Sequence, residues 1–332
     1  MYKVGIILPY FGVFPNYFDI WLATAGKNGS FDFLIMTDSN MSDFNIPDNV
    51  KVIKMTLNEI RNRVIHEVGF KVSLDSAYKL CDYKPAYGAI FEDLLSEYTH
   101  WGHCDSDIVL GDLSKFITNE RLSAYDRIYD LGHLCIYKNN KKNNRRWKMI
   151  DNLYTYNYKE VFRVKNCKMF DERGGMWDIW KQSGASEFID RTEIADIFVN
   201  PYRFTTWYSR DEQWYEYRDG CLLGHFINEK SGEEREREFA YIHLQKRRMQ
   251  NKGINLNHFI ISPNSFSQLL EFSSEEYETS IIGTTTTLRN SKLKKIIGAL
   301  KKDELIFHIR VALRRMKYWM LGRNRGYKYK YF

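Results

Sequence analysis

Proline is scarce in the sequence, and long apolar runs are missing. Only 6 prolines occur in 332 residues, and no stretch approaches the roughly 18 apolar residues of a membrane-spanning helix. The glycine patterns of dinucleotide-binding folds and of P-loops do not occur either, so neither of these nucleotide-binding classes is supported. Apolar residues nevertheless make up 44% of the chain and aromatic residues 16%. This composition excludes a disordered chain and is enough to bury a large core.

Cysteine is also uncommon, and the cysteines that occur are not paired in the sequence. They are Cys81, Cys104, Cys135, Cys167 and Cys221. Their odd number and the lack of a C-x-x-C pair favour reduced thiols over a disulfide framework. Near the N-terminus, Ala23-Thr24-Ala25 resembles a signal-peptidase site, but Pro9 and Pro15 break the apolar run before it. We therefore expect a cytoplasmic protein.

Positive charge is concentrated at one end of the chain. Residues 288–332 carry 14 lysines and arginines against Asp303 and Glu304, a net charge of +12, so the rest carries −5 of the total +7. Two segments of this tail each place apolar side chains on one helical face. They are Leu293, Ile296, Ile297 and Leu300 in the first, and Leu305, Ile309, Ala312, Leu313, Met316 and Met320 in the second.

Basic side chains accompany both faces. In the second segment Arg310, Arg314 and Lys317 lie opposite the apolar face, with Phe307, Val311 and Tyr318 among them. A basic amphipathic helix is typical of segments that lie on an anionic membrane surface. Packing of the helices on the body and nucleic-acid binding are the alternatives. We expect a peripheral protein on the inner face of the cell membrane, and no nucleic acid.

Strand-like and helix-like segments alternate through the first hundred residues. Continuous apolar runs predict strands, and amphipathic patterns predict helices. The strands are expected at Lys3–Pro9, Phe31–Ser39 and Asn49–Met55, with a later strand ending at Asp105, and the helices near Asn16–Ala25, Leu57–Val68 and Ala86–Tyr98. This alternation predicts an α/β fold, with a mostly parallel sheet flanked by helices. Such sheets bind ligands at the carboxyl ends of their strands.

Two aspartates stand at one of these strand ends, in the stretch WGHCDSDIVLGDL. Asp105 and Asp107 are two positions apart, so in an extended segment both side chains point the same way. Two carboxylates this close repel each other unless a cation lies between them, and their oxygens suit Mn²⁺ or Mg²⁺. A capped turn is the alternative interpretation. His100, His103 and Cys104 could suggest zinc, but no second ligand pair follows, and His103 is expected to pack inside the strand.

The ordered set of motifs resembles a known family. ILPYFG after the first strand, MTDS after the second, Lys84-Pro85, the D-x-D pair and the segment FAYIHLQKRRM together resemble GT-A glycosyltransferases. The last segment is similar to bacterial enzymes of capsule and O-antigen polysaccharide synthesis. The resemblance covers residues 1–250, which we expect to form a GT-A-like (Rossmann-like) domain. Residues 251–287 would connect it to the basic helical tail at 288–332.

The resemblance implies roles for individual residues. Asp105 would reach the ribose and the metal, Asp107 would be a direct ligand of Mn²⁺ or Mg²⁺, and His243 would complete the coordination. The remaining residues would surround the nucleotide. Pro9, Tyr10 and Phe11 would lie beside the base, Asp38 would bond the uracil or ribose, Lys84 would lie near the nucleotide, and Lys246 and Arg247 would neutralise the diphosphate. His243 as a core histidine and the two cations on a solvated helix are the alternatives.

A second acidic and aromatic segment, MFDERGGMWDIW, is where we look for the acceptor side. Sugars stack on aromatic rings, and a carboxylate can remove the proton of the acceptor hydroxyl. Asp171 and Glu172 are the proposed bases, followed by Asp178 and by Asp211 in SRDEQWYEY. A solvated acidic turn is the alternative for this segment, and the basic stretch at Lys138–Lys148 is expected to be an exposed loop.

The sequence thus predicts a metal-dependent glycosyltransferase that moves a sugar from a UDP-sugar to an oligosaccharide acceptor. The acceptor would be lipid-linked, and the mechanism inverting. A nucleotidyltransferase acting on sugar phosphates also uses paired carboxylates and is the chemical alternative. A non-catalytic nucleic-acid-binding protein that uses the basic tail is the alternative from another class.

Overall fold

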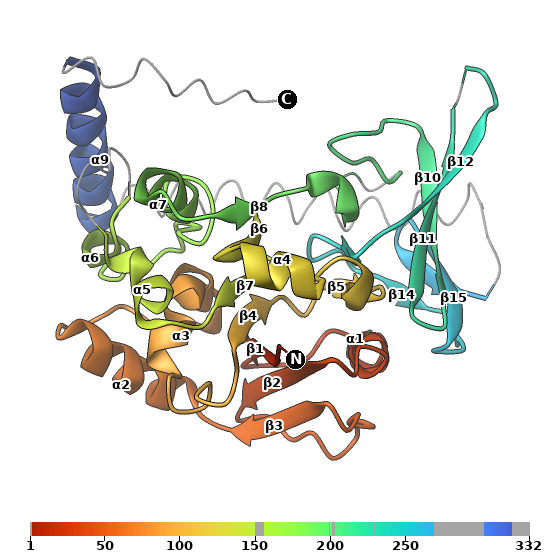
Figure 1. Cartoon of the computed structure of the whole chain (residues 1–332), viewed down its shortest axis with the longest axis horizontal. Coiled ribbons are helices and arrows are strands. Elements are labelled where there is room, and N and C mark those ends of the chain that lie inside the picture. The colour runs from red at the N-terminus through yellow and green to blue at the C-terminus, as the bar shows by residue number, and fades with distance from the viewer. Residues whose placement is uncertain are drawn as a thin grey trace.

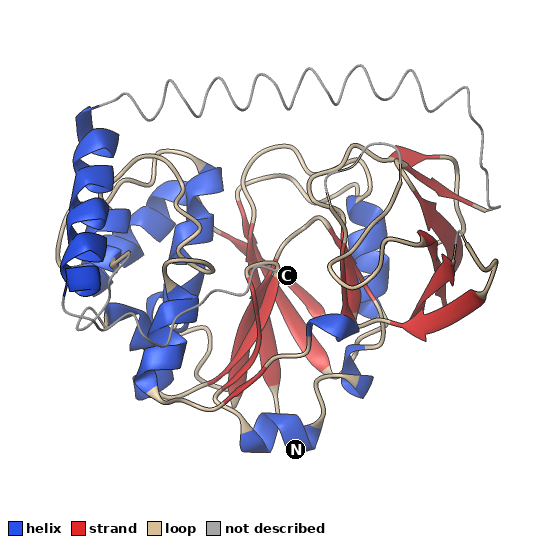
Figure 2. Cartoon of the chain, turned by 90° about the horizontal axis from the view of Figure 1, so that it is seen from above, coloured by secondary structure: helices blue, strands red, loops and turns tan. Residues whose placement is uncertain are grey.

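The computed structural model describes residues 2–149, 156–198, 200, 203–228, 230–268 and 302–320. A central β-sheet lies between groups of helices, and a second, twisted sheet stands at one end of the molecule (Figure 1). Seen from above, helices flank the central sheet on both sides, as the alternating sequence pattern predicts (Figure 2).

The central sheet has seven strands in the order β3-β2-β1-β4-β7-β6-β8. Strands β3, β2, β1 and β4 run parallel to one another, β7 is antiparallel to both β4 and β6, and β8 is parallel to β6. Their bounds are β1 Val4–Pro9, β2 Phe31–Thr37, β3 Val50–Lys54, β4 His100–Cys104, β6 Arg127–Leu131, β7 Leu134–Lys138 and β8 Glu187–Phe188. The predicted fold class, a mostly parallel sheet flanked by helices, is therefore confirmed.

Strand β1 shows why these runs are continuously apolar. Ile7 packs into the core on one face of the sheet, whereas Ile6 and Leu8 pack into the core on the other. Because helices cover both faces, no residue of the strand's interior needs to be polar.

Helices connect the strands and cover the sheet. Helix α2 begins at a capping box formed by Thr56 and Glu59 and ends at the left-handed Gly69. The elements are α1 Phe18–Gly26, α2 Leu57–Val68, η1 Ala77–Ala86, α3 Tyr87–Ile90, η2 Leu113–Lys115, α4 Asn119–Ala124, α5 Lys141–Asn144, η3 Arg146–Lys148, α6 Tyr158–Val161, α7 Met176–Ser183, η4 Arg191–Glu193 and α9 Lys302–Met320.

Two predictions for this layer are wrong. The continuous helix expected at Ala86–Tyr98 is a 3-10 helix, the four-residue α3 and a series of turns, which still bury Phe91 and Leu95. The stretch Lys138–Lys148, expected to be an exposed loop, contains buried residues. One of them is Asn144, whose side chain accepts a hydrogen bond from Trp101 Nε1 at 2.8 Å.

Two smaller sheets complete the body. The strands β12-β11-β10-β15-β16-β14 form the sheet at the end of the molecule, and β5-β13-β9 form a three-stranded sheet. Their bounds are β5 Ile108–Leu110, β9 Ile194–Asp196, β10 Glu212–Arg218, β11 Cys221–Ile227, β12 Glu234–Glu238, β13 Tyr241–His243, β14 Gln250–Asn251, β15 His258–Ser262 and β16 Ser265–Ser267. Because β15 pairs with β10, the domain boundary expected at residue 250 falls inside a sheet.

Helix α9 lies at the end of the molecule opposite the six-stranded sheet, beside α6 and α7 (Figures 1 and 2). It contacts the body through Phe307 and Val311, both buried, and through Arg314, which donates two hydrogen bonds to Glu160. These residues belong to the side that the sequence pattern assigned as polar. The predicted apolar face remains outside: Leu305, Ile309, Leu313, Met316 and Met320 are 49–65% exposed.

The first amphipathic segment of the tail, at residues 292–300, lies outside the described residues. Among the helices that the structure does describe, none combines the length and the apolar character needed to cross a membrane.

Candidate functional site

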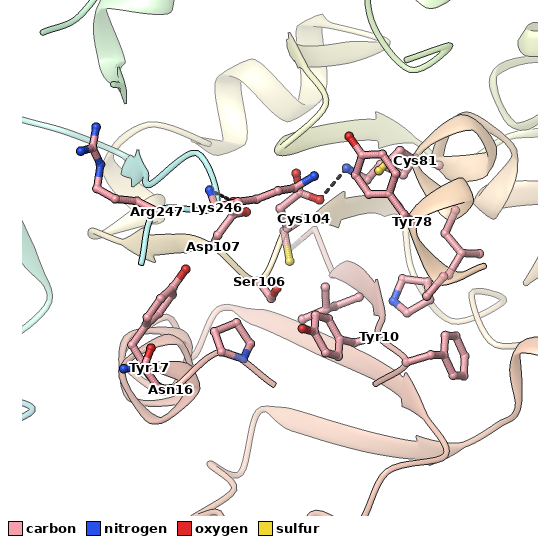
Figure 3. A pocket seen from close by; sticks show the side chains of 18 of the residues that line it. Tyr10, Asn16, Tyr17, Tyr78, Cys81, Cys104, Ser106, Asp107, Lys246 and Arg247 are labelled. Carbon is pink, nitrogen blue, oxygen red and sulfur yellow. Dashed lines mark hydrogen bonds and ion pairs between the residues drawn. The ribbon is translucent and has the colours of Figure 1, made fainter. Parts of the chain in front are cut away.

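Two cavities open beside the carboxyl ends of β1 and β4. The first, which we name the Tyr10 cavity, has a volume of about 450 Å³. Figure 3 shows the side chains that line it, with Tyr10 and Tyr17 on one side and Tyr78, Asp107 and Lys246 on the other. Its other lining residues are Leu8, Pro9, Phe11, Pro15, Asn16, Ala77, Leu80, Cys81, Lys84, Tyr87, Cys104, Asp105, Ser106, Arg247 and Arg248.

The second, which we name the Glu172 cavity, also measures about 450 Å³. Its lining combines acidic, basic and aromatic residues: Tyr78, Cys81, Lys84, Asp105, Leu131, Gly132, His133, Met169, Asp171, Glu172, Arg173, Trp177, Arg191, Asp196, Trp207, His243, Gln245 and Lys246. Five residues line both cavities, namely Tyr78, Cys81, Lys84, Asp105 and Lys246. The two cavities therefore share a wall, and Asp105 is part of it.

Asp105, Asp107 and His243 meet at this wall. One possible ligand atom from each of the three lies within 4.8 Å of the other two. Asp105 and Asp107 stand between β4 and β5, whereas His243 ends β13, which pairs with β5 so that His243 faces Ile108. The pairing of β13 with β5 thus joins two motifs that are more than 130 residues apart in the sequence.

Asp196 holds the imidazole of His243 from behind. Strand β9 is parallel to β13 and aligns Asp196 with His243, and Asp196 Oδ1 lies 3.0 Å from His243 Nδ1. The opposite ring nitrogen, Nε2, is directed at Asp107, 3.6 Å from its Oδ2. His133 stacks on the same ring with centroids 4.0 Å apart.

The sequence analysis missed both Asp196 and His133. One signal was available for Asp196, because it follows the short apolar pair Ile194-Ala195 at a strand end, as Asp105 follows β4. Nothing comparable marks His133, which lies in the short turn between β6 and β7.

Burial and charge together set the protonation states of this cluster. Burial opposes charge on all of these groups, and the neighbouring charges outweigh it at His243, Asp107 and Asp196. Asp107 and Asp196 raise the pKa of His243 to about 10. His243 in turn lowers the pKa of Asp107, as does the backbone N–H of Lys246, which donates to Asp107 Oδ2 at 2.7 Å. Burial lowers the pKa of His133, so the protonated His243 ring stacks on a neutral one.

Lys84 is buried, and its positive charge faces the carboxyl groups of Asp105 and Asp171. Its Nζ lies 2.5 Å from Asp105 Oδ1, donates to the carbonyl of Gly132 at 2.8 Å, and lies 3.6 Å from Asp171 Oδ2. Burial disfavours the charged amine, but Asp105 overcomes this effect and raises the pKa of Lys84. Lys84 thus lies in the wall between the cavities as a fixed cation.

The loop after β13 has a strained backbone. Gln245 and Lys246 both have positive φ angles, 54° and 57°, which cost of order 1 kcal/mol or more for residues other than glycine. This conformation aims the Lys246 N–H at Asp107 and places its ammonium group 3.8 Å from the centroid of the Tyr78 ring. Arg247 serves the loop itself, because its guanidinium donates to the carbonyls of Phe198 and Asn200.

Asp171 and Glu172 both line the Glu172 cavity, in different settings. Asp171 is 4% exposed, and burial raises its pKa well above the ordinary value. Glu172 is less buried, accepts a hydrogen bond from the N–H of Gly132 at 2.7 Å, and has a pKa that burial also raises. A Cβ atom on Gly132 would come within 2.3 Å of Asp171 Oδ2, so only glycine allows the two acids to pack here.

The structure places the other predicted site residues as follows. Pro9, Tyr10, Phe11 and Arg247 line the Tyr10 cavity, but the exposed Asp38 does not. Asp178 is buried within α7 and lines neither cavity. Asp211 lies directly before β10 of the six-stranded sheet, in an ion pair with Arg235.

The cluster of Asp105, Asp107 and His243 fits a divalent metal ion. Two carboxylates and one imidazole are ligands that Mn²⁺ accepts and Mg²⁺ tolerates. Asp196 occupies His243 Nδ1 and leaves Nε2 on the side of Asp107, which is the usual arrangement of a carboxylate behind a metal-bound histidine. Among the described residues, the other group that could hold a metal is His133, Asp196 and His243. The zinc alternative gains no support, since neither group contains His100, His103 or Cys104, and His103 is fully buried in β4.

Comparison with other proteins defines the family of this chain. It belongs to a family of unknown function (DUF6625), which matches residues 6–270. A search of curated protein sequences finds no match.

Two solved structures with some similarity are both of LgtC. An active-site mutant of LgtC has 10% identity and a TM-score of 0.32, with 73% of this chain and 86% of that chain covered. The galactosyltransferase LgtC in complex with donor and acceptor sugar analogs has 9% identity and a TM-score of 0.25, with 58% and 75% covered. Similarities of this size establish neither fold nor function.

The charge state of His243 can be measured directly. In metal-free buffer we expect its imidazole to stay protonated at pH 8 and to lose its proton near pH 10, as followed by NMR of the ring nitrogens. The pKa of His243 in the folded protein is higher than that of an unfolded histidine, which is about 6.5. Protonation of His243 therefore stabilises the fold fully below pH 6.5, and this stabilisation is lost as the pH rises through 10. Asp196→Asn should lower the pKa of His243. A His243 that titrates near 6.5 in the unaltered protein would contradict the described ion pairs.

Proposed function

We propose that this protein is a metal-dependent glycosyltransferase, which moves a sugar from a UDP-sugar to an oligosaccharide acceptor and inverts the anomeric centre. The observation that carries the proposal is the position of Asp105, Asp107 and His243 at the wall shared by two cavities of similar size. A transferase needs two substrates to meet at one reacting centre, and this wall would be their meeting point. The sequence resemblance to GT-A glycosyltransferases supports the same proposal.

The Tyr10 cavity suits the nucleotide of the donor. Tyr10 and Phe11 offer aromatic surface to a base, while Asp107 and Lys246 lie on the opposite side of the cavity (Figure 3), and Asp105 also lines it. The diphosphate would lie there, where the Lys246 ammonium group can neutralise growing negative charge on the leaving UDP. The predicted contact of Asp38 with the nucleotide stays a prediction. It would require the exposed loop after β2 to approach the Tyr10 cavity.

Asp105, Asp107 and His243 would hold Mn²⁺ or Mg²⁺. When bound, such an ion supplies Lewis-acid stabilisation of the diphosphate leaving group. The chain's own contribution is to keep these ligands in place. Asp196 fixes the His243 ring, and the Lys246 N–H fixes the Asp107 carboxylate.

The Glu172 cavity would take the acceptor. In the transfer, the acceptor hydroxyl oxygen bonds to the anomeric carbon, the bond from that carbon to the diphosphate oxygen breaks, and the hydroxyl proton passes to a base. Glu172 is the better base of the two predicted acids, because it is the more accessible and is not paired with Lys84. Its raised pKa brings it nearer the working range of a general base at neutral pH.

A nucleotide-sugar hydrolysis screen tests the proposal. Purified protein is incubated with a panel of UDP-sugars and Mn²⁺ or Mg²⁺, and released UDP is measured. We expect slow, metal-dependent release from one donor, with water as the acceptor. A nucleotidyltransferase would instead release pyrophosphate from a nucleoside triphosphate and a sugar phosphate. That result, without any UDP release from UDP-sugars, would replace the proposed function.

Asp107→Asn should lower donor turnover by roughly 100-fold or more, because a neutral amide is a poor replacement for a charged metal ligand. Asp196→Asn should weaken Mn²⁺ binding by about 10- to 100-fold, since it loosens a ligand rather than removing one. Asp211→Asn, directly before β10, is the matched control and should leave both unchanged. Calorimetric Mn²⁺ titration and UDP release provide the readouts. Wild-type turnover by Asp107→Asn would exclude the metal role.

The variants Glu172→Gln and Asp171→Asn test which of the two acids is the general base. Glu172→Gln should reduce transfer to an acceptor by about 10²- to 10⁴-fold while UDP-sugar affinity stays the same, because proton removal acts in the chemical step. Asp171→Asn should have a smaller effect on transfer. If Glu172→Gln retains full transfer and Asp171→Asn loses it, the roles are exchanged, and full transfer by both would point to a retaining mechanism.

We further propose that the enzyme works on a lipid-linked acceptor of surface polysaccharide synthesis, at the cytoplasmic face of the membrane. The supporting feature is α9, which exposes the apolar residues Leu305, Ile309 and Leu313 as well as the cations Arg310 and Lys317. A helix with apolar and basic residues on its outer surface suits an anionic bilayer, where each basic residue contributes about 1 kcal/mol.

Leu313→Glu should lower co-sedimentation with anionic vesicles by about tenfold, because one Leu side chain contributes roughly 1.5–3 kcal/mol on burial. Leu256→Glu is the matched control, an equal change on a partly exposed leucine near the six-stranded sheet. Added salt should weaken the binding of the unaltered protein. Equal binding by both variants would mean that α9 does not contact the bilayer.

A further inference from the structure

Two cysteines that are far apart in the sequence, Cys81 and Cys167, lie together in the structure. Cys81 belongs to η1, and Cys167 lies in the segment between α6 and α7. Their thiols are in hydrogen-bond contact with each other. Both side chains are half-buried, and Cys81 lines the Tyr10 cavity (Figure 3) as well as the Glu172 cavity. A small solute that enters either cavity therefore reaches the thiol of Cys81, which the proposed transfer step does not use.

The contact between the two segments does not depend on the cysteines themselves. Lys79 and Asp82, both on η1 and both buried, form an ion pair at 2.6 Å. Lys79 Nζ donates to the carbonyl of Asn166 at 3.0 Å, and Asp82 Oδ1 accepts from the N–H of Phe170 at 2.9 Å. These bonds anchor the segment on both sides of Cys167, so its thiol is held against η1 without a covalent link.

The five cysteines, all within the described part of the chain, differ in reactivity. The thiolate is the form that attacks an oxidant. Burial raises the pKa of three of them, Cys104, Cys135 and Cys221. The contact with Cys167 instead lowers the pKa of Cys81, and two neighbouring lysines act in the same direction. Cys81 is therefore the thiol that reacts first, and Cys167 is the partner beside it.

We propose that Cys81 and Cys167 are a redox-active thiol pair, which a hydroperoxide converts to a disulfide that reshapes the wall shared by the two cavities. The Cys81 thiolate attacks one peroxide oxygen, the O–O bond breaks, and the other oxygen leaves as an alcohol or water after taking up a proton. The sulfur of Cys167 then attacks the resulting sulfenic acid, the S–O bond breaks, and water leaves with the Cys167 proton. The two thiols thus lose two electrons, which reduce the peroxide, and a dithiol returns two electrons to restore them.

The disulfide acts on the shared wall through η1. In a 3-10 helix, residues three apart lie on the same face, and Tyr78 and Lys84 are each three residues from Cys81. A disulfide brings its sulfurs to about 2.05 Å, closer than a hydrogen-bonded pair, so η1 and the segment that leads to Glu172 are drawn together. Tyr78 and Lys84 shift with η1, and Lys84 is the cation that faces Asp105.

Oxidation of the whole, reduced chain tests the thiol pair. The protein is treated with hydrogen peroxide, the remaining thiols are counted after unfolding, and its peptides are mapped by mass spectrometry. We expect loss of two of the five thiols, a peptide in which Cys81 is cross-linked to Cys167, and recovery of both thiols with dithiothreitol. Cys81 should react about tenfold or more faster than Cys221, because a larger fraction of it is thiolate, although a lower pKa also makes a thiolate less nucleophilic.

Two variants identify the partners. Cys167→Ser should form no cross-link and should keep its UDP release in the absence of oxidant, because Cys167 lines neither cavity. Cys221→Ser is the matched control. Cys221 is also half-buried, but it lies on β11 and outside both cavities, so this variant should form the cross-link as the unaltered protein does.

UDP release from the donor found in the hydrolysis screen reports the change in the wall. Oxidation should lower it by about 10- to 100-fold, since a displacement of about 1 Å in an active site has an effect of that size, and dithiothreitol should restore it. This readout rests on the proposed glycosyltransferase function, whereas the thiol count and the peptide map do not.

Three results would overturn the inference. They are survival of Cys81 and Cys167 as thiols in peroxide, oxidation of Cys221 as fast as that of Cys81, and a disulfide that leaves UDP release unchanged. If the reduced protein releases UDP from no donor, the proposed function itself fails, and the thiol count and the peptide map still decide whether the thiol pair exists.

Discussion

Strand β13 pairs with β5 on one side and with β9 on the other, and its register aligns His243 with Ile108 and with Asp196. The contacts of His243 with Asp107 and Asp196 follow from this alignment. A slip of one residue would turn His243 to the opposite face and leave the Asp107 and Asp196 carboxylates without their common partner. Tyr241 and Ile242 are fully buried on opposite faces of the strand and fix its register. The packing of the core and the chemistry of the site therefore depend on the same three residues of β13, Tyr241, Ile242 and His243.

The amount of the fold that the sequence predicts depends on how each element is stabilised. The strands β1 and β2 are predictable, because burial on both faces requires a nearly unbroken apolar run. The turns after α3 are not, because Phe91 and Leu95 are buried at helical spacing although the backbone there is not a regular helix. For α9, the helix itself is predictable, but which face packs on the body is decided by Phe307 fitting against Tyr156 at 5.3 Å and by Arg314 reaching Glu160. Neither contact has a local sequence signal.

The residues of the candidate site also divide into those that the sequence predicts and those that it does not. Asp105 and Asp107 were predicted because they stand at the end of an apolar strand, and His243 because its segment resembles that of GT-A glycosyltransferases. Asp196 and His133 were not, since their roles come from neighbours that are distant in the sequence and adjacent only in the sheet. Arg247 makes contacts that its sequence motif does not indicate. Its sequence neighbours suggest a phosphate-binding cation, yet its guanidinium donates to the carbonyls of Phe198 and Asn200 and so holds the loop that carries Lys246. A motif gives the residue types at a site, whereas hydrogen bonding decides which of them face the ligand.

The wall shared by the two cavities has a consequence for the order of binding. Tyr78, Cys81, Lys84, Asp105 and Lys246 each contact both spaces, so a ligand that shifts any of these side chains in one cavity reshapes the other. Occupancy of the two cavities is then thermodynamically linked, and the linkage must be reciprocal: whatever factor the first ligand applies to the affinity of the second, the second applies to the first. Lys246 is the residue best placed to transmit this coupling. Its ammonium group rests on Tyr78 in the shared wall, while its strained backbone is tied to Asp107 at the proposed metal site.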